Sequence, residues 1–360
     1  MAKNNLGERA KNNLVAFVKE CDEKLEKYWD GEAKNNFGFN ETQKSLVKKM
    51  LLHAKEHNLR SAKRARAAFV YYGYLLGSEK ETEKIWDVCE GVELVHTALL
   101  MHDDFMDRDK VRRGSPTTQE IFAEGDAHYG DSMAVNIGDA VLCLGFERVL
   151  ASGFEDKKIN VVMKQLLRGI ANTAYGQAYD VSLPKLGELT EEKVMSLHRA
   201  KTAIYTYENP LLIGGVLAGL EDGVLDTLRE YSVYGGVAFQ IQDDILGVFG
   251  DEEKTGKSNN SDLLQGKVTL LIVKVLELGT MEQRESLLAV WGKSEAGTEE
   301  IERAKKAIKE SGSYEYSVKV ARELNEKSIK IIQKLRKLNL NSEAIDYLEG
   351  IARYMIDREV

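Results

Sequence analysis

Apolar residues recur three or four positions apart along most of this 360-residue chain, and only 3 prolines are present to interrupt the pattern. That spacing puts apolar side chains on one face of a helix, and a chain so poor in proline can form long helices. Alternating apolar and polar residues, which mark a half-buried strand, do not persist for more than a few positions. The sequence therefore predicts an all-α fold.

The same periodicity places the helices along the chain. We expect them over residues 12–29, 42–57, 62–77, 83–105, 132–150, 160–179, 190–220 and 225–249, followed after Gly266 by further amphipathic helices. Pro210 should kink its helix rather than end it, because apolar residues continue beyond it. Residues 250–266 form a polar, glycine-bearing loop. We expect one domain over residues 1–360, with residues 1–24 as an N-terminal extension or helix.

Composition excludes several classes of protein. Apolar residues make up 43% and charged residues 30%, as in globular chains. A formal charge of −8 argues against a nucleic-acid partner. The N-terminus lacks the apolar core of a signal peptide, and the longest apolar stretches are too short or too glycine-rich to span a membrane. Cys21, Cys89 and Cys143 lack metal-ligand spacing, which favours reduced, buried thiols in a cytoplasmic protein.

Four aspartates crowd the end of the expected helix 83–105, at positions 103, 104, 107 and 109. On a helix, Asp103 and Asp107 lie about 5.4 Å apart along one face. Like charges at this spacing, and anions at a helix C-terminus, destabilise the helix, so a compensating cation is expected. Two such carboxylates can share Mg²⁺, whose shell is completed by water and phosphate oxygens. The alternative is a solvated acidic helix end.

A second apolar helix, 225–249, also ends in an aspartate pair, Asp243 and Asp244. Two such helices can face each other in a bundle and hold metal ions between them. Basic residues gather near these segments, at Lys63, Arg64, Arg66, Arg112, Arg113, Lys201, Lys257 and Lys267. Arginine binds phosphate through paired hydrogen bonds and lysine as a point charge. Carboxylates, cations and an apolar interior together suit a diphosphate ester with an apolar tail.

In these motifs the chain resembles the trans-isoprenyl diphosphate synthases, the head-to-tail prenyltransferases that include farnesyl and geranylgeranyl diphosphate synthases. ELVHTALLMHDDFMDRDKVRRGSPT resembles the family's first aspartate-rich motif with its trailing RRG, and FQIQDDILGVFGD resembles the second. AKRARA stands where the family has GGKRLRP, GQAYD matches GQxxD, and AKTAIYT matches the lysine–threonine motif. The resemblance runs from about residue 25 to the end. It implies a single helical bundle of the isoprenoid synthase type with a central apolar cavity, and a homodimer.

The resemblance also implies an activity: condensation of isopentenyl diphosphate with an allylic diphosphate to give an all-trans polyprenyl diphosphate. Asp103 and Asp107 would bind Mg²⁺ with support from Asp104, and Asp243 would bind it from the second motif, with about three ions in all. The residues expected on the allylic diphosphate are Arg112, Lys201 and Lys257. Those expected on isopentenyl diphosphate are Lys63, Arg66, His96 and Arg113, and Lys267 is a further substrate-binding candidate. The allylic carbons would lie along Thr202 and Gln240, in a cavity also lined by Gln177 and Asp180.

The chain departs from the family pattern at two places. Gly247 replaces the third aspartate of the second motif, where Asp251, two turns beyond Asp243, is a candidate to contribute through water. Ser61 and Ala62 stand in place of the glycine pair, and Ala67 in place of the proline. Since glycine permits close backbone approach, the isopentenyl diphosphate is expected to bind more weakly or in another pose.

Other residues carry structural expectations. His53, His57 and His128 are expected at the surface, His102 beside the first motif as an orienting residue, and His198 on a helix without an identifiable partner. Tyr71, Tyr72 and Tyr74 are expected in the core, and Arg358 is a candidate for a tail that closes over the site.

The length of the product depends on residues that precede the first motif. Ala98 and Leu99, one turn before Asp103, are expected to point toward the growing chain, with Gly91 two turns further back. Because none of these is aromatic, we expect geranylgeranyl diphosphate or longer products, with farnesyl diphosphate as the alternative. Residues on facing helices could instead form the floor, meaning the side chains that block further growth of the product chain.

Two other classes compete with this interpretation. A terpene cyclase shares the helical fold and one DDxxD, but its second metal motif combines asparagine or aspartate with serine or threonine and glutamate, unlike FQIQDDILGVFGD. A non-catalytic prenyltransferase subunit typically loses an aspartate motif, whereas the first is intact here.

Overall fold

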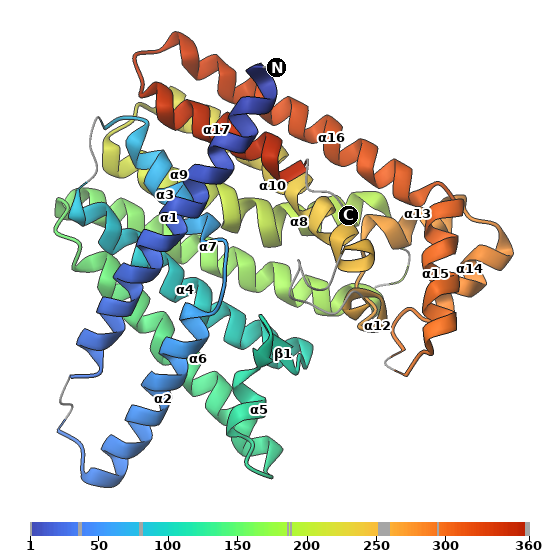
Figure 1. The fold of residues 1–360 in the computed structure, drawn as a ribbon, viewed down its shortest axis with the longest axis horizontal. Coiled ribbons are helices and arrows are strands. Elements are labelled where there is room, and N and C mark those ends of the chain that lie inside the picture. The colour runs from blue at the N-terminus through green and yellow to red at the C-terminus, as the bar shows by residue number, and fades with distance from the viewer. Residues whose placement is uncertain are drawn as a thin grey trace. The chain divides into compact units, whose positions relative to one another are not determined.

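The computed structural model describes residues 2–34, 38–78, 82–185, 187, 189–250, 260–293 and 295–356, and Figure 1 shows their helices. In chain order the elements are α1 (Ala2–Glu32), α2 (Glu41–Leu59), α3 (Ala65–Leu75), α4 (Glu83–Asp107), β1 (Val111–Arg112), β2 (Ser115–Pro116), α5 (Thr118–Phe122), α6 (Ala127–Leu150), α7 (Asp156–Ser182), η1 (Leu183–Lys185), α8 (Glu191–His198), η2 (Arg199–Glu208), α9 (Asn209–Ala218), α10 (Asp222–Phe249), α12 (Ser261–Leu264), α13 (Leu270–Leu278), α14 (Met281–Leu288), α15 (Thr298–Glu310), α16 (Ser313–Ile332), η3 (Gln333–Lys337) and α17 (Ser342–Ile356). The all-α prediction is confirmed. Lys257, Asp251 and Arg358 lie outside the described residues.

The chain divides into two compact units, each carrying one aspartate motif. The first-motif unit comprises Asn12–Lys164 with Ile213–Gly219. The second-motif unit comprises Met1–Lys11, Gln165–Leu212 and Leu220–Val360. The expectation of one domain over the whole chain stays a prediction.

In the first-motif unit, α4 and α6 run side by side, as Figure 1 shows. Glycine permits this approach, because a Cβ at Gly91 would lie 2.8 Å from the carbonyl oxygen of Gly145, and the reverse distance is also 2.8 Å. Gly91 therefore faces α6, and the expectation that it lines the path of a growing chain is wrong. The same unit contains an apolar cluster of buried side chains: Trp29, Ala54, Leu94, Ala98, Met101, Phe122, Met133, Ile137 and Val141.

A short hairpin follows α4 and folds back over its C-terminal end. Strands β1 and β2 pair antiparallel, with Arg112 opposite Ser115. The two residues between them, Arg113 and Gly114, have φ values of 53° and 76°. Positive φ at both positions is the pattern of a type I′ turn, whose twist suits two antiparallel strands. Strands of two residues are too short to show alternation, so the sequence did not predict them.

In the second-motif unit, α10 packs against α16 and η2. Gly236 of α10 permits the close approach of η2, because a Cβ there would lie 2.5 Å from the Cα of Ala203. The segment η2 is a π-helix that ends just before Pro210, and the N–H of Asn209 bonds to the carbonyl of Ile204. The irregularity predicted at Pro210 therefore lies in Arg199–Glu208, the segment before α9. Wide π turns of this kind are frequent at functional sites.

The tyrosine group, the cysteines and the lengths of the apolar helices compare with the expectations as follows. Tyr72 and Tyr74 are buried, and Tyr71 contacts Phe17 and Trp86, so the tyrosine group belongs to the core as predicted. The three cysteines are free thiols, but Cys143 is exposed rather than buried. Among the described helices, none combines the length and the apolar character that crossing a membrane requires.

Candidate active site

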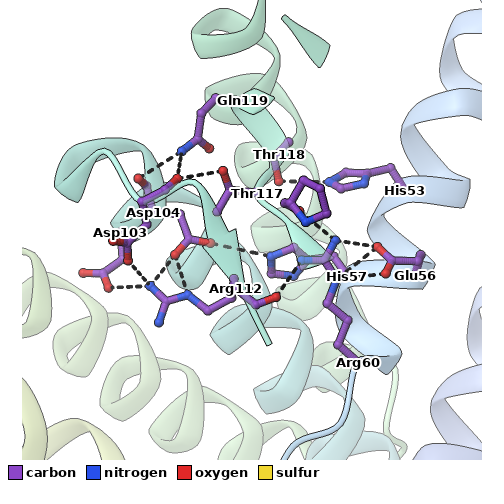
Figure 2. Close-up of polar contacts among 12 residues, drawn as sticks. His53, Glu56, His57, Arg60, Asp103, Asp104, Arg112, Thr117, Thr118 and Gln119 are labelled. Atoms are coloured by element: carbon purple, nitrogen blue, oxygen red, sulfur yellow. Dashed lines mark hydrogen bonds and ion pairs between the residues drawn. The ribbon is translucent and has the colours of Figure 1, made fainter. Parts of the chain in front are cut away.

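The carboxylate of Asp104 lies at the centre of the first motif and is completely buried. Arg112 reaches back from β1 and donates hydrogen bonds to it, and the backbone carbonyl of Asp104 accepts one from the side chain of Gln119 at 3.1 Å. Figure 2 shows these groups converging from α4, the hairpin and α5. Asp104 thus anchors the hairpin, and its expected support of Mg²⁺ binding stays a prediction.

Arg112 is the compensating cation that the crowded aspartates require. Besides Asp104, its guanidinium lies 3.5 Å from Asp103 and 3.1 Å from Asp109. The side chain is only 8% exposed, so these ion pairs are weakly screened by water. The contact expected between Arg112 and the allylic diphosphate stays a prediction, and in the structure this guanidinium is bound by aspartates.

Asp103 and Asp107 remain partly exposed on α4 while Asp104 turns inward. The helix continues through Asp107, so the two carboxylates lie one turn apart on one face. Oxygen donors of this kind fit Mg²⁺, which takes few protein ligands and completes its shell with water and phosphate. Within the described ranges, no group of three or more histidine, cysteine, aspartate or glutamate side chains could hold a metal by itself.

Arg60, immediately after α2, fixes the hairpin through its backbone. Its guanidinium donates to the carbonyl oxygens of Arg112 at 3.1 Å and Pro116 at 2.9 Å, and it pairs with Glu56 at 2.7 Å. Figure 2 shows Arg60 and Glu56 approaching the hairpin from α2. Arg60 was not singled out from the sequence. Its position beside the basic segment 63–66 is the signal that could have identified it.

The two histidines of α2 are buried, so the expectation that they lie at the surface is wrong. His53 Nε2 lies 2.9 Å from the hydroxyl of Thr118, and its ring contacts Phe122 edge-on. Burial, followed by the nearby His57, lowers the pKa of His53 to about 4. The His57 ring is fully buried with Nε2 3.8 Å from Asp104, and burial lowers its pKa as well. Of the three, only His128 is exposed as expected.

His102 contacts α6, and the orienting role expected of it stays a prediction. Its Nε2 lies 3.4 Å from Asp139 on α6, and its ring packs against Gly138. The ring therefore contributes to the packing of α4 on α6.

Three residues expected to hold isopentenyl diphosphate come together in the first-motif unit. Arg66 lies 3.0 Å from Nε2 of His96. Burial and the charges of Arg66 and Arg113 lower the pKa of His96 far below its usual value, so this imidazole is neutral. Burial and the neighbouring Arg64 lower the pKa of Arg113 to about 10. This basic cluster, defined as Arg66, His96 and Arg113, combines two guanidinium groups with a neutral imidazole and has the charge to receive an anion.

The basic residues at the start of α3 have different surroundings. Arg64 is buried and donates to Asp22 at 2.8 Å and to Glu93 at 3.2 Å, which makes it a structural residue. Lys63 is exposed. At Ala67, where the family has proline, the backbone N–H donates to Glu93 at 3.2 Å. Proline lacks this N–H, so the departure from the family pattern gives the buried Glu93 an extra donor.

In the second-motif unit, a chain of polar contacts links η2 to α10 and α8. Thr202 donates to Gln240 at 2.6 Å, and Gln240 donates to Asp244 at 2.7 Å. His198 Nε2 lies 3.0 Å from the other oxygen of Asp244, and both side chains are buried. The structure thus joins Thr202 and Gln240, whose expected position along the allylic carbons stays a prediction, and supplies the partner that the sequence did not reveal for His198.

The remaining candidates of this unit come from α7, η2, α10 and the segment after α12. Lys201 donates to Asp180 at 2.7 Å. Gln177 is buried on α7, and Asp243 is partly exposed on α10 next to the buried Asp244. Lys267 pairs with Asp262 at 3.0 Å.

The two residues expected to control chain length differ in their surroundings. Ala98 is completely buried in the apolar cluster with Trp29 and Met101, whereas Leu99 is partly exposed on α4, as is Asp103 one turn later. The position of Leu99 on the face of Asp103 suits the expected role better than that of Ala98.

Comparisons with known proteins agree with these features. A model of the polyprenyl synthetase family matches residues 48–308. The geranylgeranyl diphosphate synthase of Saccharolobus solfataricus is 31% identical, over 79% of this chain and 82% of that protein. The geranylfarnesyl diphosphate synthase of Aeropyrum pernix is 30% identical, over 79% of this chain and 86% of that protein.

The fold is likewise that of a solved structure. A geranylgeranyl pyrophosphate synthase from Corynebacterium glutamicum, solved in complex with isoprenyl diphosphate and magnesium, has a TM-score of 0.83 and 25% identity, with 99% of each chain covered. The fold class predicted from the sequence is confirmed.

Proposed function

We propose, since the chain belongs to the polyprenyl synthetase family, that it condenses isopentenyl diphosphate head-to-tail with an allylic diphosphate. The product is an all-trans polyprenyl diphosphate of geranylgeranyl length or longer, in line with the relatives that make geranylgeranyl and geranylfarnesyl diphosphate. Farnesyl diphosphate is the alternative product.

The observation that carries this proposal is the contrast between Arg112 and Arg113, adjacent residues of one hairpin. Arg112 is surrounded by the carboxylates of Asp103, Asp104 and Asp109. Arg113 lies among arginines, which together with burial depress its pKa. One side of the hairpin therefore offers carboxylates suited to a metal-bound diphosphate, and the other offers cations suited to a metal-free one. A reaction between two diphosphates needs both.

The metal would be held by Asp103 and Asp107 of the first motif and by Asp243 of the second, with about three Mg²⁺ ions in all. Bound Mg²⁺ neutralises the charge that develops on a departing diphosphate. The residues themselves then orient the substrates. Lys201 would add a positive charge at the allylic diphosphate, while Arg66, His96 and Arg113 would hold isopentenyl diphosphate.

The condensation itself would proceed between the two substrates. The allylic C–O bond breaks, the electron pair leaves with diphosphate, and the alkene of isopentenyl diphosphate attacks the allylic cation. A proton is then lost from the condensed cation to the released diphosphate. Thr202 and Gln240 present hydroxyl and amide dipoles that would face the cation, and surrounding apolar side chains would exclude water.

The test is diphosphate release and product sizing with isopentenyl diphosphate and each allylic primer, with and without Mg²⁺. We expect Mg²⁺-dependent release and prenyl products that require isopentenyl diphosphate. Release from the allylic substrate alone would instead identify a cyclase, and absence of release with every primer would identify a non-catalytic subunit. Asp103→Asn should abolish release, whereas the control Asp226→Asn, at an exposed position of α10, should not affect it.

Two further predictions concern assembly, which the resemblance implies, and location, which the cysteines indicate. We propose a homodimer, to be measured by light scattering coupled to size-exclusion chromatography, and a cytoplasmic location, to be measured by cell fractionation. The expected absence of a nucleic-acid partner follows from the net charge of −8 and stays a prediction.

A further inference from the structure

Gly247 and Asp262 occupy complementary positions in the second-motif unit. A Cβ placed on Gly247 would lie 2.3 Å from Oδ2 of Asp262, so the carboxylate fills the space that a side chain at 247 would need. Gly247 belongs to α10, and Asp262 belongs to the short helix α12 that packs against it. The glycine is therefore the feature of α10 that admits this carboxylate.

Helix geometry places that carboxylate relative to Asp243. Positions 243 and 247 are one turn apart, and residues at this spacing are neighbours on one helix face, with Cβ atoms about 5–6 Å apart. The side chain of Asp262 thus lies on the face of α10 that carries Asp243. Asp243 and Asp262 are both partly exposed, so this face is accessible to an ion.

The charge around Asp262 also fits a role in the site. Lys267 donates to Oδ1 of Asp262 at 3.0 Å, whereas Oδ2 is the oxygen nearest Gly247. The ion pair orients the carboxylate and leaves its other oxygen directed at α10. Lys267 is itself one of the substrate-binding candidates, which places a cation beside the same face.

We propose that Asp262 supplies the carboxylate that the second aspartate motif lacks at position 247. The inference rests on the proposed function, because it assigns a further residue to the same Mg²⁺ and diphosphate site. Asp262 acts together with Asp243, either on the ion directly or through its water, and Lys267 positions it. Glycine at 247 is part of the arrangement, since aspartate there would bring a second like charge into the same space.

The experiment measures binding of inorganic diphosphate to the full-length protein by calorimetry, at a series of Mg²⁺ concentrations. We expect Asp262→Asn to weaken the apparent Mg²⁺ affinity about tenfold, as is typical when a residue around a metal site is lost. Asp262→Ala should do the same, and the double variant Gly247→Asp with Asp262→Ala should recover most of the loss. Gly247→Asp alone should bring no gain, because both carboxylates would compete for one position.

Two control variants separate this role from others. Lys267→Gln should weaken diphosphate binding at every Mg²⁺ concentration, with a smaller shift in Mg²⁺ dependence than Asp262→Asn, because Asp262 keeps its carboxylate and loses only the ion pair that orients it. Asp226→Asn, an exposed aspartate on the same helix, should behave like the wild type. Circular dichroism melting of each variant shows whether it is folded when assayed.

The outcomes distinguish the inference from the proposed function. If the wild-type protein bound diphosphate without any dependence on Mg²⁺, the proposed function would be wrong. If the wild type responded to Mg²⁺ and Asp262→Asn responded identically, only the role of Asp262 would be overturned. The same holds if the folded double variant bound Mg²⁺ no better than Asp262→Ala.

Discussion

The guanidinium of Arg60 donates a hydrogen bond to the backbone carbonyl of Arg112, 52 residues further along the chain. Arg112 in turn binds aspartates of the first motif. The residue that ends α2 therefore holds the backbone of the hairpin that carries Arg112. Because Arg60 binds only backbone atoms of the hairpin, the side chain of Arg112 remains available for its ion pairs.

Replacing Arg60 by methionine should damage both stability and catalysis. The carbonyls of Arg112 and Pro116 lose their donor, and leaving the buried one, that of Arg112, unsatisfied costs about 1–3 kcal/mol. We expect a lower free energy of unfolding by urea denaturation, and a kcat reduced more than the KM for either substrate. Arg229→Met is the control, because Arg229 forms an exposed pair with Asp226 and should cost less than about 0.5 kcal/mol. Equal effects of the two variants would contradict this role of Arg60 in holding the hairpin.

His198 should act as a positioning residue for Asp244 and, through Gln240, for Thr202. We expect His198→Leu to lower kcat about tenfold with little change in the KM for isopentenyl diphosphate, since the loss lies on the side of the second motif. His198→Gln keeps a polar group beside Asp244 and should recover much of the activity. A similar loss in both variants would show that the imidazole fills space rather than donating a hydrogen bond.

The sequence predicted the helices and the residue types of the site because both depend on local patterns. Helical periodicity gave α4 and α10 close to their observed ends, and the spacing of Asp103 and Asp107 fixed a shared face once the helix was known. The aspartates and cations could be assigned because each belongs to a contiguous motif.

What the sequence did not predict depends on partners that are distant in the chain. His57 meets Asp104, and His198 meets Asp244, only after the helices pack, and a histidine within a polar stretch carries no sign of burial. The contact between Gly247 and Asp262 likewise requires α12 to fold against α10. Gly91 was misassigned because a small residue can indicate open space or close packing, and here α6 fills the space.

Stability should decrease on the acid side through His53. Its pKa is about 4 in the folded chain, against about 6.5 unfolded, so between these values the unfolded state binds more protons. Stability is therefore fully present above pH 6.5 and is lost as pH falls toward 4, by about 2 kcal/mol between pH 7 and pH 5. His53→Gln, which can still bond to Thr118, should reduce this slope in urea denaturation. The exposed His128→Gln should leave the slope unchanged.

Binding of isopentenyl diphosphate should depend on the charge of Arg113. This guanidinium is charged below its pKa of about 10 and neutral above it, so affinity should fall as pH rises through 10. Arg113→Met should weaken metal-free binding by about 1.5–3 kcal/mol, the value of a hydrogen bond to a charged group, and should remove the alkaline dependence. Calorimetry in the presence of a chelator measures both effects. Arg108→Met, an exposed neighbour, is the matched control, and an equal loss there would contradict the assignment.

Product length should respond to Leu99 more cleanly than to Ala98. A phenylalanine at 98 must enter a closed cluster around Trp29, and overpacking a core costs about 1–3 kcal/mol. Leu99 is partly exposed on the face of Asp103, so Leu99→Phe should fold normally and shift products toward farnesyl diphosphate. We expect Ala98→Phe to lower the melting temperature and to shorten products less than Leu99→Phe does. Products from each allylic primer are sized by chromatography, and an unchanged length in both variants would show that the floor lies on another helix.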